Sequence, residues 1–191
     1  MSSHRSAQRV ANALIIIDMN ARDVKKLYNG TAVLNNQLKL IDAFRKRKQK
    51  IILVGGGRSG SVLARSKRNP VIERLWGAEG EHDPEGNKII PELMHAPYDK
   101  YVDKSEYSAF FKTDLERYCK KNKIGALYFC GIYTGCCVYF SAVDAAMRRI
   151  QPYLVTDASS SVSPAWHRKH VSNFTTFIGP AVTTNAVLKK I

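Results

Sequence analysis

The chain has 191 residues, of which 45% are hydrophobic and 24% are charged. This length and this composition are typical of one soluble globular domain with a single sizeable core. No apolar stretch is long enough to cross a membrane. We therefore expect neither a membrane-spanning protein nor a membrane partner. We expect a single domain over residues 1–191, in which residues 1–10 form a basic tail.

The formal net charge is +14, from 30 Lys and Arg against 16 Asp and Glu. Such a charge attracts anionic small molecules, nucleic acid or acidic membranes without deciding among them, and no RNA-binding motif accompanies it. The four cysteines have no CxxC spacing. Neither a disulfide framework nor a zinc cluster is therefore indicated, and a reducing, cytoplasmic location is expected. A very short mitochondrial presequence within residues 1–9 is the alternative.

Apolar runs alternate with amphipathic segments along the chain. The expected strands are 11–17, 51–54, 98–102, 126–130, 152–156 and 181–184. The expected helices are 34–44, 113–123, 137–149 and 163–177, with a short helix at the C-terminus. Thr113 and Glu116 have the spacing of a capping box. Alternating strands and helices predict a three-layer α/β/α, Rossmann-like domain whose central sheet has five to six mainly parallel strands.

Asp18 directly follows the first predicted strand. In open parallel sheets, ligands bind beyond the carboxyl ends of the strands, so Asp18 is a candidate for chemistry. The alternative is an aspartate that caps a turn or a helix.

A glycine-rich loop, residues 55–57, follows the second predicted strand and leads to Arg58. It lacks the Gly-Lys-Ser/Thr signature of a phosphate loop, so nucleotide binding is only weakly indicated. Glycines also allow the backbone to approach a pocket, where Arg58 could bind an anionic group.

Cys136 and Cys137 lie in a small-residue turn between the predicted strand 126–130 and the helix that follows. The positive end of a helix dipole stabilises a thiolate there, and the unpaired backbone N–H groups could bind an oxyanion. Two alternatives stay open. The cysteines could be small apolar residues in a tight turn, or they could form a redox pair, which would require a strained turn.

Three sequence features follow one another along the chain. Asp18 ends the first strand, Lys104 opens a Lys-x-x-x-Ser-Ala-Phe segment, and Cys137 follows a Gly-Ile turn at residues 131–132. With these motifs the chain resembles the isochorismatase-like hydrolases, also called the cysteine hydrolase superfamily, over residues 11–184. The likeness leans toward the isochorismatase branch, because of segments 68–77, 104–110, 131–133 and 144–158.

The resemblance implies a catalytic triad of Asp18, Lys104 and Cys137. Asp18 would be the general base, Cys137 the nucleophile, and Lys104 would hold both electrostatically. The resemblance also implies a cis peptide bond between Ile132 and Tyr133, with an oxyanion hole formed by the backbone N–H groups of Tyr133 and Cys137.

Arg58, Arg68, Trp76 and Tyr133 are the candidate substrate-binding residues. No cofactor and no metal are implied. The metal ligands of nicotinamidases would fall where residues 55–58 stand here. The histidines have no matching spacing and are interpreted as surface residues.

The chain keeps a cysteine where many members of the isochorismatase branch have a small residue. This favours hydrolysis of a C–N amide or ureide bond through a Cys137 thioester, in a small anionic metabolite. Vinyl-ether hydrolysis of the isochorismate type is the second reading of the site. A non-catalytic or RNA-associated basic member of the same fold is the alternative function. By resemblance, a homodimer or homotetramer is expected.

Overall fold

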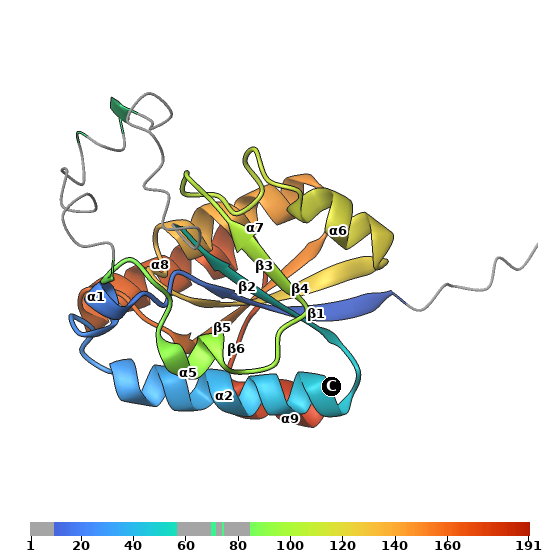
Figure 1. Ribbon diagram of the computed structural model, residues 1–191, viewed down its shortest axis with the longest axis horizontal. Helices are drawn as coiled ribbons and strands as arrows, with labels where there is room; N and C mark the ends of the chain where they lie inside the picture. The colour runs from blue at the N-terminus through green and yellow to red at the C-terminus, as the bar shows by residue number, and fades with distance from the viewer. Residues whose placement is uncertain (1–9, 57–69, 72–73, 75–84) are drawn as a thin grey trace, which may run out of the picture.

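The computed structural model describes residues 10–56, 70–71, 74 and 85–191 (Figure 1). The strands are β1 (Ala11–Ile17), β2 (Lys50–Gly55), β3 (Lys100–Asp103), β4 (Ile124–Gly131), β5 (Gln151–Ser159) and β6 (Ala181–Val182). The helices are α1 (Ala21–Val24), α2 (Gly30–Lys46), α5 (Pro91–Met94), α6 (Leu115–Lys121), α7 (Cys137–Met147), α8 (Pro164–Phe177) and α9 (Thr184–Lys190). The strands form one sheet in the order β3-β2-β1-β4-β5-β6, and every neighbouring pair is parallel.

Helices cover both faces of this sheet (Figure 1). On β1, Ala13, Ile15 and Ile17 face the layer of α6, α7 and α8, whereas Leu14 and Ile16 face the layer of α2, α5 and α9. All five side chains are at most 1% exposed, because a strand in the middle of a three-layer domain is covered on both sides. The predicted α/β/α architecture is confirmed, and within the described residues the sheet is entirely parallel.

The strand order indicates the edge of the sheet at which a ligand can bind. From the central β1 the chain moves to β2 and β3 on one side and then to β4 on the other. The connections therefore leave the carboxyl ends of β1 and β4 in opposite directions, which is where open α/β sheets bind their ligands. Asp18 follows β1, Lys104 follows β3, and the turn to Cys137 follows β4.

Several predicted boundaries differ from the structure. The capping box is wrong: Asp114 is the N-cap of α6, and Thr113 Oγ1 donates to the Ala109 carbonyl at 2.6 Å. Glu116 pairs with Lys120 and Arg148 rather than with a helix N-terminus.

Other elements have shifted ends as well. Helix α2 begins at Gly30, four residues before the predicted start. The last strand ends at Val182, because Thr183 caps α9 by accepting a hydrogen bond from the Ala186 N–H group. None of the helices in the described ranges is long and apolar enough to span a membrane.

Candidate active site

Asp18 is fixed at the carboxyl end of β1 by its backbone. Its N–H donates to the Val54 carbonyl at 2.9 Å, and its carbonyl accepts from the Asn20 N–H at 2.7 Å. The φ angle of Asp18 is +53°, in the left-handed region that aspartate enters more readily than most residues. The chain therefore turns sharply at Asp18, and only 17% of its side chain is exposed.

Lys104 brings the three predicted triad residues together. Its Nζ lies 2.7 Å from Asp18 Oδ2 and 3.4 Å from Cys137 Sγ, and it donates to the Glu106 carbonyl at 3.0 Å. An ammonium group has three N–H donors, and each has an acceptor here. The side chain is only 8% exposed, and the Lys104 backbone is held to β2 by a bond to the Gly55 carbonyl. Lys104 is thus a fixed charge between an acid and a thiol.

Lys104 is charged at neutral pH. Burial alone would lower the pKa of its ammonium group, but the Asp18 carboxylate and the Cys137 sulfur outweigh burial and raise that pKa above its ordinary value. Lys104 therefore stays an ammonium group where it contacts Asp18.

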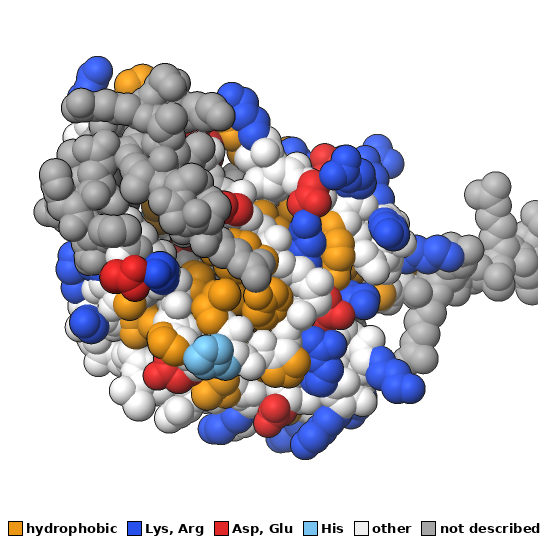
Figure 2. Space-filling model, in the orientation of Figure 1, with side chains coloured by type: hydrophobic (Ala, Val, Ile, Leu, Met, Phe, Trp, Pro, Cys, Tyr) orange, Lys and Arg blue, Asp and Glu red, His pale blue; other side chains and the backbone are white. Residues whose placement is uncertain are grey.

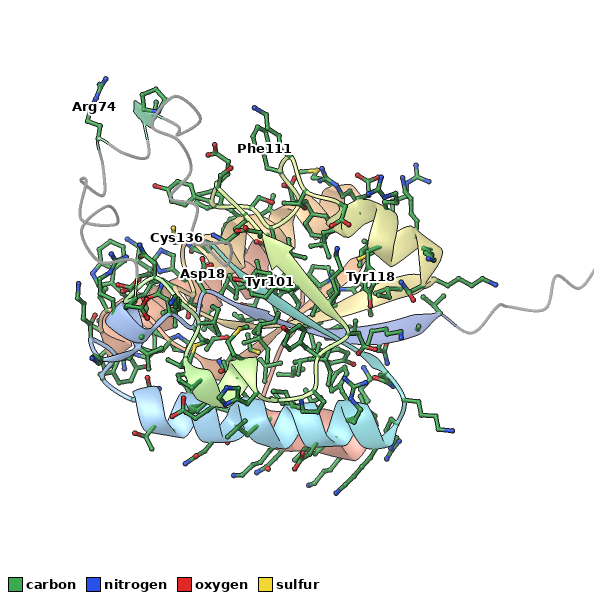
Figure 3. All side chains as sticks on the ribbon, in the orientation of Figure 1. Asp18, Arg74, Tyr101, Phe111, Tyr118 and Cys136 are labelled. Atoms are coloured by element: carbon green, nitrogen blue, oxygen red, sulfur yellow. The ribbon has the colours of Figure 1, made fainter. Side chains whose placement is uncertain are left out.

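Cys137 is the first residue of α7, and its sulfur rests as a thiol. Its hydrogen bond with the Cys136 thiol, its burial and the Asp18 carboxylate together raise the pKa of Cys137, although Lys104 acts in the opposite direction. At Cys137, the hydrogen bond with Cys136, burial and Asp18 thus outweigh the charge of Lys104. The lowered pKa belongs to Cys136, through its hydrogen bond with the Cys137 thiol. Figure 3 shows Cys136 beside Asp18 at one end of the sheet, with Tyr118 well away from both.

The turn after β4 is tied to the strands beside it. The peptide bond between Ile132 and Tyr133 is cis. The Ile132 N–H donates to the Ile17 carbonyl at 2.9 Å. Gly131 has a φ of +113°, and a Cβ atom on it would lie 2.1 Å from the Ile17 carbonyl oxygen. Only glycine therefore permits this approach of β4 to β1.

The substrate-binding residues predicted from the sequence fall into two groups. Arg58, Arg68 and Trp76 lie outside the described residues. Tyr133 lies at the site and is half-buried. Burial and a hydrogen bond with the Asp23 carboxylate raise the pKa of the Tyr133 hydroxyl.

His167, on α8, is a contact that the sequence did not predict. Its Nδ1 lies 2.8 Å from Thr134 Oγ1, in the turn between β4 and α7. The interpretation of His167 as a surface residue is wrong, because the side chain is half-buried and burial lowers its pKa. One turn further, the His170 ring packs against Gly135, where an added Cβ would lie 2.3 Å from the ring. The spacing of His167 and His170 at i, i+3 was the only signal in the sequence.

The described residues contain no group of three or more His, Cys, Asp or Glu side chains that could hold a metal ion. All four cysteines, which lie within the described ranges, are free thiols. The arrangement thus offers one base, one nucleophile and one fixed positive charge.

Comparison with known proteins assigns the chain to a family. The model of the Isochorismatase domain family matches residues 12–186. Phenazine biosynthesis protein PhzD1 of Pseudomonas aeruginosa is 34% identical over 119 residues, which are 62% of this chain and 58% of that protein. The isochorismatase family protein YwoC of Bacillus subtilis is 28% identical over 179 residues, which cover 94% of this chain and 93% of YwoC.

Solved structures share the fold. The crystal structure of a cysteine hydrolase from Pseudomonas syringae pv. phaseolicola superposes with a TM-score of 0.81 over 94% of this chain and 91% of that one, at 19% identity. The family match spans nearly all of the described elements, from β1 to α9. The predicted resemblance is therefore confirmed. The chain belongs to the isochorismatase family of hydrolases.

Proposed function

We propose that this protein hydrolyses a C–N bond of an amide or ureide in a small anionic metabolite, through a thioester on Cys137. One observation carries the proposal: the buried Lys104 ammonium contacts both the Asp18 carboxylate and the Cys137 sulfur. A carboxylate that accepts protons and a thiol that carries one are thus held by the same group.

The first half of the reaction forms the thioester. Asp18 takes the Cys137 thiol proton while the sulfur attacks the substrate carbonyl carbon, and the carbonyl oxygen becomes an oxyanion. We assign the oxyanion to the backbone N–H groups of Tyr133 and Cys137, at the N-terminus of α7, where the helix dipole is positive. When the C–N bond breaks, the protonated Asp18 gives its proton to the leaving nitrogen.

The second half releases the acid. Asp18, again a carboxylate, removes a proton from water, which attacks the thioester carbon. The C–S bond then breaks, and the proton returns to the Cys137 sulfur. Lys104 stays charged throughout and keeps the acid and the sulfur in place. The raised pKa of Cys137 fits this sequence, because a resting thiol needs a base before it can attack.

Vinyl-ether hydrolysis is the second reading of the same site. There Asp18 would donate a proton to carbon, and no nucleophilic sulfur would be needed. The Cys137 sulfur, which Lys104 contacts at 3.4 Å, would have no part in that reaction. We therefore prefer the amide or ureide reaction.

The triad is tested with a panel of small primary amides and ureides, by following ammonia release, with isochorismate in a separate assay. Cys137→Ala and Asp18→Asn should each lower kcat at least about a thousandfold on the substrate that the unchanged protein hydrolyses. Cys119→Ala is the matched control, because that thiol belongs to α6 and is buried in the core. Full activity of both triad variants would refute the triad, and loss in Asp18→Asn alone would favour vinyl-ether chemistry.

The RNA-associated alternative rests on the net charge of +14. Figure 2 shows Lys and Arg side chains around the rim of one face, with Asp and Glu between them, rather than in one continuous stripe. Electrostatic binding to RNA should weaken steeply with salt. An RNA titration without binding at roughly 50 mM salt would reject this alternative.

Two expectations about the whole protein stay predictions. A homodimer or homotetramer would be seen by light scattering during size-exclusion chromatography. A cytoplasmic location would be seen by microscopy of the tagged protein.

A further inference from the structure

Arg22 lies next to the candidate active site and has an unused hydrogen-bond donor. It is on α1, four residues after Asp18, and its backbone N–H donates to the Gly86 carbonyl at 2.9 Å. Nη1 of Arg22 is buried and has no hydrogen-bond partner within the described part of the chain. A buried donor without an acceptor is costly, most of all when it belongs to a charged group. The position therefore suits an acceptor that arrives with a ligand.

The neighbouring carboxylate satisfies Arg22 only partly. Asp23 Oδ1 accepts from Nε of Arg22 at 3.4 Å, which is long for a charge-assisted hydrogen bond. The other Asp23 oxygen accepts from Asn20 Nδ2 at 2.9 Å, and the Asp23 carboxylate also bonds the Tyr133 hydroxyl. Asp23 thus fixes the guanidinium beside the turn that leads to Cys137 and leaves Nη1 for another anion.

A second arginine with an unpaired donor atom serves as a comparison for Arg22. Nε of Arg45 is also buried without a partner in the described residues. However, Nη2 of Arg45 already donates to the Pro97 carbonyl at 3.0 Å and lies 3.2 Å from Asp99. Arg45 lies in the last turn of α2, at the end of the sheet where β2 begins. Arg45 therefore lies at the opposite end of the strands from the triad residues.

We propose that the Arg22 guanidinium binds a carboxylate of the substrate, so that the preferred substrates are amides or ureides that carry a free carboxylate group. This role of Arg22 rests on the proposed hydrolase function. The planar guanidinium offers parallel N–H donors that match the two oxygens of a carboxylate. The net charge of +14 also attracts such anions to the protein.

Binding can be measured apart from turnover. In the Cys137→Ala protein, calorimetry would compare oxamate, malonamate, succinamate and glutaramate with their neutral methyl esters. We expect at least one acid to bind roughly tenfold to a hundredfold more tightly than its ester. Arg22→Gln should remove this preference, Arg22→Lys should restore part of it, and Arg45→Gln should keep it. A melting curve of each variant checks that it is folded.

The outcomes separate the two proposals. Equal binding of acids and esters, no binding of any acid, or a preference that survives in Arg22→Gln would overturn the role of Arg22. Hydrolysis by the unchanged protein without a preference for acids would leave the hydrolase function intact while rejecting Arg22 as the anchor. Acid binding through Arg22 without any hydrolysis would support the anchor and count against the hydrolase function.

Discussion

Nζ of Lys104 lies 2.7 Å from Oδ2 of Asp18, and neither side chain is more than 17% exposed. Ion pairs on the surface contribute little to stability, but removing one partner of a buried pair leaves a charge without compensation. The two residues are 86 positions apart in the chain and follow different strands, β3 and β1. Their pairing therefore couples the folding of the sheet to the assembly of the site.

Lys104→Met removes the ammonium group but keeps a side chain of similar length. We expect the free energy of unfolding to fall by about 3 kcal/mol, because the Asp18 carboxylate loses its buried counter-ion. The double variant Asp18→Asn/Lys104→Met should be more stable than Lys104→Met alone, since it leaves no unpaired charge. Urea unfolding of the three proteins measures both effects.

Lys88→Met is the matched control for that comparison. Lys88 pairs with Glu85 at the surface, where its side chain is 52% exposed. Its loss should cost less than about 0.5 kcal/mol. If the double variant were as unstable as Lys104→Met, the cost would not come from an unpaired Asp18, and the electrostatic role of Lys104 would be wrong.

Gly131→Ala tests the close approach of β4 to β1. The new Cβ would meet the Ile17 carbonyl oxygen at 2.1 Å, and alanine is disfavoured at a φ of +113°. We expect a loss of at least about 3 kcal/mol in the free energy of unfolding, since both atoms belong to central strands that cannot move apart easily. Chemical denaturation measures it, and a loss below about 1 kcal/mol would show that the turn is less constrained than described.

His167 makes stability depend on pH. Thr134 Oγ1 donates to the Ser160 carbonyl at 2.9 Å, so its single proton is used and Nδ1 of His167 must be the donor in their bond. Burial, followed by the charges of His170 and Arg168, lowers the pKa of His167 in the folded protein. Below pH about 6.5 the unfolded chain binds a proton that the folded protein does not, so stability falls as the pH drops.

His167→Asn keeps a donor near Nδ1 and removes the titration. Its stability should fall less between pH 7.5 and 5.5 than that of the unchanged protein, by at most about 1.4 kcal/mol per pH unit for one proton. Urea unfolding at three pH values measures the two slopes. Equal slopes would mean that His167 is protonated as easily in the folded protein as in the unfolded chain.

Much of this architecture could be predicted from local pattern. Continuous apolar runs such as residues 11–17 and 51–54 are strands in the structure, because buried parallel strands need apolar side chains on both faces. The placement of Asp18 after such a strand made it a candidate for chemistry, and its meeting with Lys104 was implied by the family resemblance.

The sequence could not predict features that depend on contacts between distant segments. The bond of His167 to Thr134 and the unpaired Nη1 of Arg22 exist only once α8 and α1 are packed beside the turn after β4. The proposed capping box failed for a similar reason, because Arg148 on the end of α7 binds Glu116. The raised pKa of Cys137 likewise follows from its hydrogen bond with Cys136, from burial and from Asp18, which outweigh the charge of Lys104.

The central claim is that Cys137 attacks the substrate through its sulfur, and rapid quenching followed by mass spectrometry tests it most directly. Acid quench during turnover of an identified amide or ureide should give a protein whose mass is raised by the acyl group, and peptide fragmentation should place that group on Cys137. Cys137→Ala should show no such adduct, and Cys136→Ala should keep it. Steady turnover by the unchanged protein with no adduct on Cys137 at any time, or with the adduct on another residue, would contradict the account.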